Sequence, residues 1–449
     1  MKFYIKTYGC QMNERDADAA AALLMKRGFS RAARESTADI VIVNTCSVRG
    51  KAEDKAVGKL RLLVRDRGGE NAGQLIGAMG CMAQRLKEDI FVQVPGLDFS
   101  VGTHRLACLP AVIAKAMEGR GRPVLDIAEE DCGGEDVCGH TPGGISAFVN
   151  ILFGCNRGCS YCVVPEVRGR EWSRPGPSIV EEVAELARAG TREITLLGQS
   201  VMSYGRANEV WPDGHKSPRS FHEPLPRLLE AINDIDGLAR VRFTSGHPSG
   251  CTPELGRAMK ELELVCEHLH IPVQSGSDRI LRLMRRGYTV DIYRDAVRTI
   301  RTAVPGIAIT TDIIVGFPGE TMEEFEMTRS LLREIPFDNS FIFKYSPRPG
   351  TEAEKAMADD IPASEKMRRN KLLLKDQEAV ALSINEEMVG LTVEVLVEGI
   401  GRKSFSRWSG RTRTGKIVAF EPEDGVGRGD LVRVNITRAM PYTLYGKIV

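Results

Sequence analysis

The segment GCNRGCSYCVVP, residues 154–165, holds three cysteines at CxxxCxxC spacing: Cys155, Cys159 and Cys162. Three thiolates at this spacing suit a four-iron cluster and leave one iron open to an exchangeable ligand. A structural zinc site normally closes four ligands with paired CxxC elements or histidines, and no histidine lies close to this segment. Buried thiols without a metal are the other alternative. The motif therefore predicts an iron–sulfur cluster with one reactive iron.

Around this motif, strand-like and helix-like segments alternate, which predicts repeated βα units. The strand-like segments are SAFVNILFG, REITLLGQ, ARVRFTS, CEHLHIPV, GIAITTDIIVG and DNSFIFKYS. These segments predict an incomplete parallel barrel, in which reactive groups lie at the C-terminal ends of the strands. The marked residues near predicted strand ends are Cys155, Gln199, Ser245, Gln274, Asp312 and Tyr345.

The N-terminal part of the chain shows the same alternation, with a cysteine after each of three predicted strands. Cys10 follows FYIKTYG, Cys46 follows DIVIVNT and Cys81 follows QLIGAMG. Parallel strands bring their C-terminal ends to one edge of a sheet, where open α/β sheets bind ligands. We therefore predict a second three-cysteine iron–sulfur cluster at this edge. The alternative is three small residues of the apolar core.

The last part of the chain differs in character. A helical stretch around 362–388 is followed by short strand-like segments with glycine turns, which predict a small β-barrel. The stretch at 119–143, which is rich in glycine and acidic residues, is predicted to be a linker, in which Cys132 and Cys138 have no assigned role. Residues 203–225 are predicted to form a surface loop. The chain is thus expected to be an α/β protein with four parts. They are an N-terminal parallel-sheet domain at 1–118, the linker at 119–143, a partial (βα)6 barrel at 144–376 and an all-β barrel at 377–449.

The composition favours a cytoplasmic enzyme. The chain of 449 residues carries 61 Lys and Arg against 60 Asp and Glu, so any nucleic-acid surface has to be local. No basic and then apolar leader is present, and no apolar run approaches the ~18 residues that cross a bilayer, so no membrane partner is expected. The 11 cysteines favour metal binding over a disulfide framework.

Longer segments resemble a known family. The CxxxCxxC motif with an aromatic residue before its third cysteine is similar to the signature of radical S-adenosylmethionine (SAM) enzymes. From residue 3 to the end, the chain closely resembles the MiaB-type tRNA methylthiotransferases, which join a methylthiotransferase domain, a radical SAM barrel and a TRAM domain. The matching segments are YIKTYGCQMNERDADA, NTCSVRGKAEDK, GCMAQR, CSYCVVPEVRGRE, LLGQSVMSYG, PVQSGSDRILRLMRRGYT and DIIVGFPGETMEEF.

The resemblance implies two 4Fe–4S clusters. It assigns the auxiliary cluster to Cys10, Cys46 and Cys81, and the SAM cluster to Cys155, Cys159 and Cys162. The implied reaction methylthiolates C2 of N6-isopentenyladenosine at position 37 of tRNA. One SAM methylates a sulfur on the auxiliary cluster, and another yields the 5′-deoxyadenosyl radical that removes hydrogen from C2. A radical suits this step because the aromatic C–H offers no acidic proton to a general base.

The same resemblance implies the partners and the polar residues of the pocket. The partners are the anticodon stem-loop of tRNA, a sulfur donor, and an electron donor such as flavodoxin or ferredoxin. The candidates for SAM binding are Gln199, Ser245, Gln274 and Asp312. For the two glutamines, capping of a following helix is the alternative. Arg168 and Arg170 are expected to meet a carboxylate or a phosphate, or to pair with Glu171.

A local basic surface is expected on the last barrel. Its residues are Arg402, Lys403, Arg407, Arg411, Arg413, Lys416, Arg433 and Arg438, interleaved with Phe405 and Trp408. Such a surface suits the phosphates and unpaired bases of an RNA loop, and a solvated polar face is the alternative.

Two other functions compete with the first. Sister families carry out the same chemistry on N6-threonylcarbamoyladenosine 37 of tRNA or on an aspartate of a ribosomal protein. The segments GCQMN and CVVP favour N6-isopentenyladenosine as the substrate. The basic residues of the C-terminal barrel argue against a protein substrate. An RNA-binding or electron-transfer iron–sulfur protein without SAM chemistry is the third possibility, which leaves the open iron unexplained.

Overall fold

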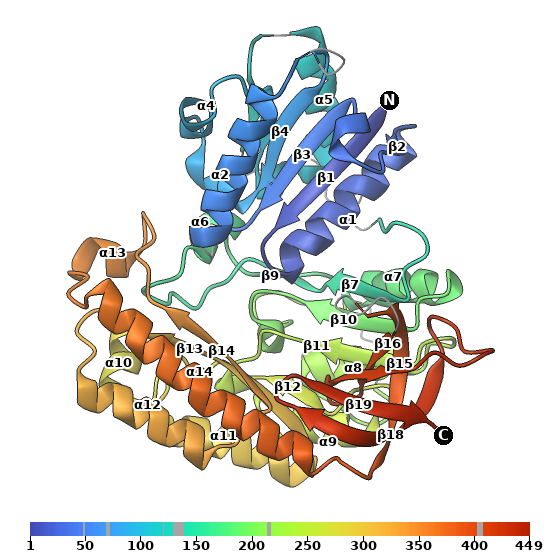
Figure 1. The fold of residues 1–449 in the computed structure, drawn as a ribbon, viewed down its shortest axis with the longest axis vertical. Coiled ribbons are helices and arrows are strands. Elements are labelled where there is room, and N and C mark those ends of the chain that lie inside the picture. The colour runs from blue at the N-terminus through green and yellow to red at the C-terminus, as the bar shows by residue number, and fades with distance from the viewer. Residues whose placement is uncertain (48–49, 69–71, 120, 129–138, 213–216, 402–406) are drawn as a thin grey trace. The chain divides into compact units, whose positions relative to one another are not determined.

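The computed structural model describes residues 1–449 except 48–49, 69–71, 120, 129–138, 213–216 and 402–406 (Figure 1). The chain forms two compact units. The first unit consists of Met1–Pro142, Phe148–Asn156 and Cys162–Trp172. The second unit consists of Gly143–Ala147, Arg157–Tyr161 and Ser173–Val449.

A six-stranded sheet forms the centre of the first unit, with the strand order β2-β1-β3-β4-β5-β6. Every strand pairing in this sheet is parallel. The strands are β1 (Lys2–Tyr8), β2 (Ser30–Arg31), β3 (Ile40–Thr45), β4 (Leu75–Gly80), β5 (Phe99–Val101) and β6 (Val124–Asp126). The central strands β3 and β4 are buried along their whole length, as expected for a parallel sheet that is covered on both faces.

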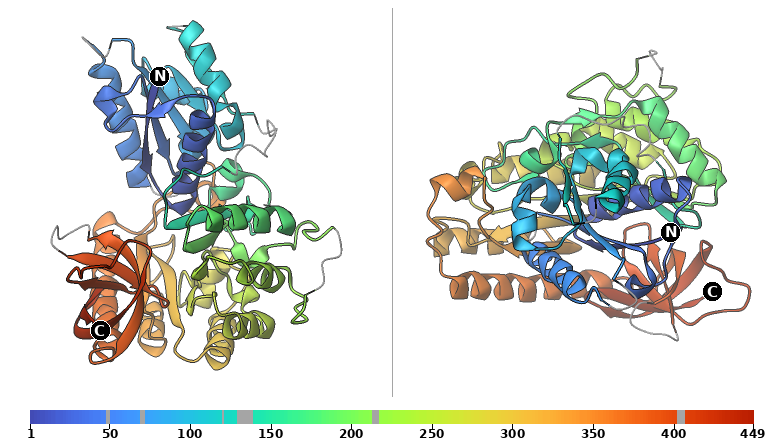
Figure 2. Two further views of the ribbon diagram at one scale, coloured as in Figure 1. Left: turned by 90° about the vertical axis from the view of Figure 1, so that its right-hand side faces the viewer. Right: turned by 90° about the horizontal axis from the view of Figure 1, so that it is seen from above.

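Helices cover both faces of this sheet (Figure 2). On β3, Ile40 and Ile42 face a cluster with α1 and α5, whereas Val41 and Val43 face a cluster with α2, α3 and α4. The helices are α1 (Gln11–Lys26), α2 (Gly50–Arg65), α3 (Cys81–Leu86), α4 (Asp89–Gln93), α5 (Leu109–Glu118) and α6 (Val164–Arg168). The alternation of apolar side chains along each strand thus builds two cores from one sheet.

The structure differs from the expected linker at 119–143. Val124–Asp126 forms β6, which pairs with β5 in the register Phe99↔Val124. Three residues are too few for a period-2 pattern, so only pairing with the sheet edge reveals this strand. Residues 120 and 129–138, with Cys132 and Cys138, lie outside the described residues.

The second unit begins with the predicted partial barrel. Two sheets, β11-β10-β7 and β12-β13-β14, carry its six strands, and a parallel bridge between Val241 and Val265 lies between them. The strands are β7 (Ser146–Asn150), β10 (Glu193–Leu197), β11 (Arg240–Phe243), β12 (His268–His270), β13 (Ala308–Val315) and β14 (Asn339–Lys344). β7 begins in this unit and ends in the first, and the short pair β8 (Leu152–Phe153) and β9 (Trp172–Ser173) follows it along the chain.

Helices follow the barrel strands, which confirms the predicted βα pattern. They are α7 (Gly176–Arg188), α8 (Pro224–Asn233), α9 (Pro253–Glu261), α10 (Asp278–Leu283), α11 (Val290–Ala303), α12 (Met322–Glu334), α13 (Glu352–Ala356) and α14 (Ala363–Glu386). The boundary expected at residue 376 falls inside α14, which is continuous and packs on β14 and β18. None of the described helices has the length and apolar character that crossing a membrane requires.

Residues 203–225 form a loop over most of their described length, as expected, but several of their side chains are buried rather than on the surface. Tyr204, Trp211 and Phe221 are each no more than 6% exposed. The guanidinium of Arg227 lies 5.3 Å from the centre of the Trp211 ring. Aromatic side chains therefore anchor this loop to the rest of the second unit.

The C-terminal strands close into the predicted small barrel, in the order β15-β16-β17-β19-β18 (Figure 2). They are β15 (Thr392–Ile400), β16 (Trp408–Thr412), β17 (Ile417–Phe420), β18 (Leu431–Met440) and β19 (Thr443–Ile448). Inward-facing residues such as Val397, Phe420 and Leu444 form its core. Closure leaves no free sheet edge.

Part of the predicted RNA surface instead attaches this small barrel to the larger one. Arg413 forms an ion pair with Glu267 at 2.8 Å, and Lys416 forms one with Asp338 at 2.7 Å. Buried Arg242 donates hydrogen bonds to the backbone oxygens of Thr412 and Arg413. Arg413 and Lys416 are thus removed from the expected basic surface, because their charges are matched inside the unit.

Further members of that expected surface also have partners. Arg411 pairs with Glu398, and Arg407 pairs with Glu421, both at 2.8 Å. Arg438 is exposed and lies over the ring of Tyr445 at 4.3 Å, and Arg433 is exposed. Arg402, Lys403 and Phe405 lie outside the described residues. The basic surface that remains is smaller than the sequence suggested.

Arg413→Met is expected to lower the free energy of unfolding by about 1 to 2 kcal/mol, because the half-buried Glu267 and the backbone oxygen of Val265 lose a charged donor. Thermal and urea unfolding measure this change. Arg407→Met is the matched control, since its ion pair with Glu421 is exposed, and we expect a change within about 0.5 kcal/mol. Equal effects of the two variants would contradict the structural role given to Arg413.

Candidate cluster and cofactor sites

The first unit brings three thiols together at one edge of its sheet. Cys10 is the residue before α1 and follows β1, Cys46 follows β3, and Cys81 begins α3 directly after β4. Because β1, β3 and β4 are neighbouring parallel strands, their C-terminal ends lie side by side. The thiols of Cys10 and Cys46 are hydrogen-bonded, and Cys81 interacts electrostatically with Cys10.

Two glycines make room for these thiols. Gly9 has φ +151°, and a Cβ built there would lie 2.6 Å from the Cβ of Cys46. Gly80 has φ +92°, and its added Cβ would lie 2.4 Å from Oδ1 of Asn44. Both distances are shorter than any relaxed contact, so the loops before Cys10 and Cys81 require glycine.

Two buried asparagines support the same loops, and the sequence analysis missed them. Asn13 Nδ2 donates to Asn44 Oδ1 at 3.2 Å, and Asn44 Nδ2 donates to the backbone oxygen of Asn13 at 2.7 Å. Both side chains are 0% exposed, and the Cys10 thiol donates to Asn13 Oδ1 at 3.2 Å. The signal in the sequence was an asparagine three positions after Cys10 and another two positions before Cys46.

A buried ion pair adjoins the thiols. Arg168 of α6 is 6% exposed, its Nε lies 3.3 Å from Sγ of Cys81, and its Nη2 lies 2.6 Å from Oδ2 of Asp16. Of the roles expected for Arg168, pairing with a carboxylate is the one observed, and the partner is Asp16 in α1 rather than Glu171.

These contacts shift the thiol pKa values in opposite directions. The hydrogen bond with Cys46 lowers the pKa of Cys10 to about 6, with help from the charge of Arg168 and against the effect of burial. Burial raises the pKa of Cys81, although Arg168 opposes the rise. A thiolate is the form that binds iron, and the donor set fits an iron–sulfur cluster because all three candidate ligands are cysteine sulfurs.

The cysteines of the CxxxCxxC motif belong to both units. In the first unit, the backbone N–H of Cys155 donates to the oxygen of Gly169 at 3.2 Å, and Cys162 is partly buried. In the second unit, Cys159 precedes Ser160, whose hydroxyl donates to the backbone oxygen of Leu283 at 2.7 Å. Across the described residues, no group of three or more His, Cys, Asp or Glu side chains is arranged to hold a metal ion.

Arg286 is a second buried arginine beside a candidate ligand cysteine. It is 8% exposed, and its Nη1 lies 3.2 Å from Sγ of Cys159. Its Nε donates to the hydroxyl of Tyr288 at 3.1 Å, and its Nη2 lies 3.5 Å from the backbone oxygen of Pro272. Sequence reasoning missed it, and the doubled arginine in LMRRGYT was the available signal.

Two of the candidate SAM residues carry polar atoms without a protein partner. Oε1 of Gln199 and Oε1 of Gln274 are buried and accept no hydrogen bond from any described residue. Ser277, not Gln274, caps α10 through its hydroxyl, so the capping alternative for Gln274 is wrong. A buried oxygen without a donor is costly, and a ligand rich in N–H and O–H groups, as SAM is, fits this need.

The other two candidates are placed differently. Ser245 lies just past β11 and has φ +58°, and Gln274 shares this left-handed conformation at φ +70°. Strained backbone of this kind is enriched at ligand sites. Asp312 lies inside β13 rather than near its end, because β13 continues to Val315. Its Oδ2 lies 3.4 Å from Nε2 of His270.

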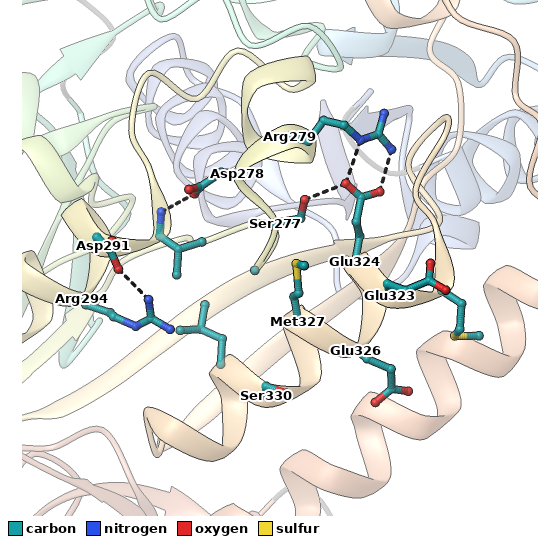
Figure 3. Close-up of a pocket in the computed structure, with 14 residues that line it drawn as sticks. Ser277, Asp278, Arg279, Asp291, Arg294, Glu323, Glu324, Glu326, Met327 and Ser330 are labelled. Carbon is teal, nitrogen blue, oxygen red and sulfur yellow. Dashed lines mark hydrogen bonds and ion pairs between the residues drawn. The ribbon is translucent and has the colours of Figure 1, made fainter.

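A groove on the second unit lies apart from these residues. Figure 3 shows it between α10, α11 and α12. Its two arginines pair with carboxylates of the lining, Arg279 with Glu324 at 2.6 Å and Arg294 with Asp291 at 2.7 Å. Neither a cysteine nor a SAM candidate lines it, so the groove adds nothing to the site.

Comparison with known proteins agrees with this architecture. Three family models match the chain: "Uncharacterized protein family UPF0004" at residues 2–102, "Radical SAM superfamily" at 149–332 and "TRAM domain" at 386–449. The fold resembles a radical SAM methyltransferase, TsrM, from Kitasatospora setae, with a TM-score of 0.57 and 16% identity over 79% of this chain and 74% of that one. The barrel and its cysteine motif therefore place this chain in the class of radical SAM proteins.

Curated relatives narrow this class to a family. A tRNA-2-methylthio-N(6)-dimethylallyladenosine synthase of Moorella thermoacetica is 44% identical over 100% of this chain and 98% of its own length. One of the same name from Akkermansia muciniphila is 42% identical over 99% of this chain and 98% of its own length. The chain therefore belongs to the MiaB-type family of radical SAM methylthiotransferases, as its sequence motifs indicated.

Proposed function

We propose that this protein methylthiolates C2 of N6-isopentenyladenosine at position 37 of tRNA. One SAM supplies the methyl group, a second supplies the radical, and a sulfur donor supplies the sulfur. The observation that carries the proposal is the position of Cys10, Cys46 and Cys81 after three neighbouring parallel strands, in a chain that also holds a CxxxCxxC motif. The names of the full-length relatives support the choice of nucleoside.

In this proposal the two cysteine sets have separate tasks. Cys155, Cys159 and Cys162 would bind a 4Fe–4S cluster with an open iron, which supplies reductive cleavage of SAM when it is bound. Cys10, Cys46 and Cys81 would bind the auxiliary cluster, which supplies a site for the transferred sulfur. The chain itself contributes thiolate ligands, glycine loops that admit them, and buried polar atoms that orient SAM.

The protein surface is proposed to contact the tRNA anticodon stem-loop through the small barrel. Arg433 and Arg438 remain exposed there, and the ring of Tyr445 beneath Arg438 offers a stacking partner for an unpaired base. An electron donor of the flavodoxin or ferredoxin type completes the set of proposed partners.

The decisive test is anaerobic reconstitution with iron and sulfide, followed by incubation with SAM, a reductant and tRNA that carries N6-isopentenyladenosine. Mass spectrometry then measures 5′-deoxyadenosine and the 2-methylthio nucleoside. Formation of both supports the proposal. If 5′-deoxyadenosine forms while the nucleoside stays unmodified, the substrate is instead N6-threonylcarbamoyladenosine or a ribosomal-protein aspartate. If neither forms in protein with full clusters, the proposal fails.

Gln274→Ala is expected to weaken SAM binding by about tenfold, because one buried hydrogen bond to the ligand is lost. Calorimetric titration of SAM into reconstituted protein measures the change. Gln377→Ala is the control, since Gln377 is equally buried but bonds Ser340 and the backbone oxygen of Phe337 away from any candidate residue. SAM affinity that is unchanged in Gln274→Ala would remove Gln274 from the pocket.

A further inference from the structure

We infer that Arg286 raises the reduction potential of the cluster that Cys159 helps to bind, and so directs the incoming electron to that cluster rather than to the auxiliary one. The inference rests on the proposed function, because it requires both clusters. Its physical basis is a difference between two buried arginines, each of which donates to the sulfur of one proposed ligand.

Both guanidinium groups are held in place by several contacts. Arg286 reaches Sγ of Cys159 at 3.2 Å, and Arg168 reaches Sγ of Cys81 at 3.3 Å. Both side chains are less than a tenth exposed, so water screens neither charge effectively. Each N–H therefore has a fixed direction toward a ligand sulfur, which is the geometry that tunes iron–sulfur centres.

The charge balance of the two arginines is different. Both oxygens of Asp16 face Arg168, at 2.6 and 3.4 Å, so this guanidinium is largely neutralised before a cluster binds. The other hydrogen bonds of Arg286 are to neutral groups, the hydroxyl of Tyr288 and the backbone oxygen of Pro272. Within the described part of the chain, Arg286 forms no ion pair with a carboxylate.

Tyr288 does not supply the missing negative charge. Burial raises the pKa of its phenol, and the hydroxyl lies 3.0 Å from the backbone oxygens of both Pro272 and Val273. A neutral hydroxyl that donates to a carbonyl accepts the N–H of Arg286 with its oxygen. Among the hydrogen-bond partners of this guanidinium, the sulfur of Cys159 is the one that would carry negative charge as a ligand of the cluster.

This difference has a direct effect on electron transfer. Reduction of the cluster from the 2+ to the 1+ state adds one electron, which comes from a one-electron donor of the flavoprotein or iron–sulfur class. When bound, the cluster would supply that electron for the reductive cleavage of SAM into methionine and the 5′-deoxyadenosyl radical. A nearby positive charge stabilises the state with the extra electron, and an N–H donor to sulfur acts in the same direction.

The test is a redox titration of each cluster in the full chain, followed by electron paramagnetic resonance in the absence of SAM. A background with Cys10, Cys46 and Cys81 changed to alanine isolates the SAM cluster. In it, Arg286→Gln is expected to lower the ratio of reduced to oxidised cluster by about tenfold at a fixed potential, a shift of about 59 mV for one electron. Arg286→Lys keeps the charge and is expected to shift the potential by less.

For the auxiliary cluster, a shift of the reduction potential in the opposite direction is expected. In a background with Cys155, Cys159 and Cys162 changed to alanine, Asp16→Asn leaves the charge of Arg168 without its partner, so the potential of that cluster is expected to rise. A purely structural role of these arginines predicts changes in iron content but no shifts of opposite sign.

Several results would overturn the inference. One is an unchanged potential in Arg286→Gln at full iron and sulfide content. Loss of the cluster in both Arg286→Gln and Arg286→Lys is another, because Arg286 would then be needed for assembly and not for tuning. Failure of the proposed function looks different: the protein with all other residues intact would then bind no cluster at Cys159, or would bind one and leave SAM uncleaved.

Discussion

Cys159→Ala is expected to abolish both 5′-deoxyadenosine and the methylthiolated nucleoside, whereas Cys46→Ala is expected to abolish only the nucleoside. Cys159 belongs to the motif that is proposed to bind a cluster with one open iron, so its loss would remove the proposed site of SAM cleavage. Cys46 belongs to the thiol edge of the first unit and would hold the cluster that carries sulfur. Each loss should exceed about a hundredfold, because even changes to groups behind the ligands cost about 10- to 100-fold.

Cys251→Ala is the matched control for both variants. Cys251 is a buried free cysteine in the second unit, and burial raises the pKa of its thiol to about 12, which disfavours the thiolate. Its iron content and both products should equal those of the unchanged protein. The assignment of separate tasks is refuted if Cys46→Ala still produces the methylthio nucleoside, or if Cys159→Ala still releases 5′-deoxyadenosine.

Gly80→Ala is expected to destabilise the first unit by about 2 to 6 kcal/mol and to prevent loading of the auxiliary cluster. The new Cβ would lie 2.4 Å from Oδ1 of the buried Asn44, and the backbone would hold alanine at φ +92°. Strain and overpacking each contribute about 1 to 3 kcal/mol. Because Cys81 is the next residue, the backbone shift that relieves the clash also moves a proposed ligand.

Denaturant unfolding and iron analysis measure the two effects of Gly80→Ala. Gly58→Ala is the control, since Gly58 lies in α2 with no atom within 4 Å of an added Cβ, and alanine there should be neutral or stabilising by up to about 1 kcal/mol. The iron bound by Gly80→Ala should fall toward the content of Cys46→Ala. Full loading of both clusters would show that the loop adapts and that the glycine is not required.

The order of elements could be predicted because each part has its own periodicity. The buried runs of β3 and β4 read as parallel strands, and cysteines directly after β1, β3 and β4 could be placed at one edge by topology alone. The three-residue strand β6 and the anchored segment around Trp211 could not be predicted, since both depend on contacts with distant residues. The position of Asp312 was also not predicted correctly, because the sequence pattern did not show that β13 continues to Val315.

Sequence by itself determined which cysteines are the candidate ligands, because cysteine spacing and position after a strand are local properties that no folding event changes. Only the tertiary structure decided which charges surround those thiols. Arg168 is 87 residues from Cys81, and Arg286 is 127 residues from Cys159, so no local pattern pairs them. The folded structure also matched Arg413 and Lys416 with carboxylates, which a count of basic residues could not foresee, since charge pairing depends on distance in space and not along the chain.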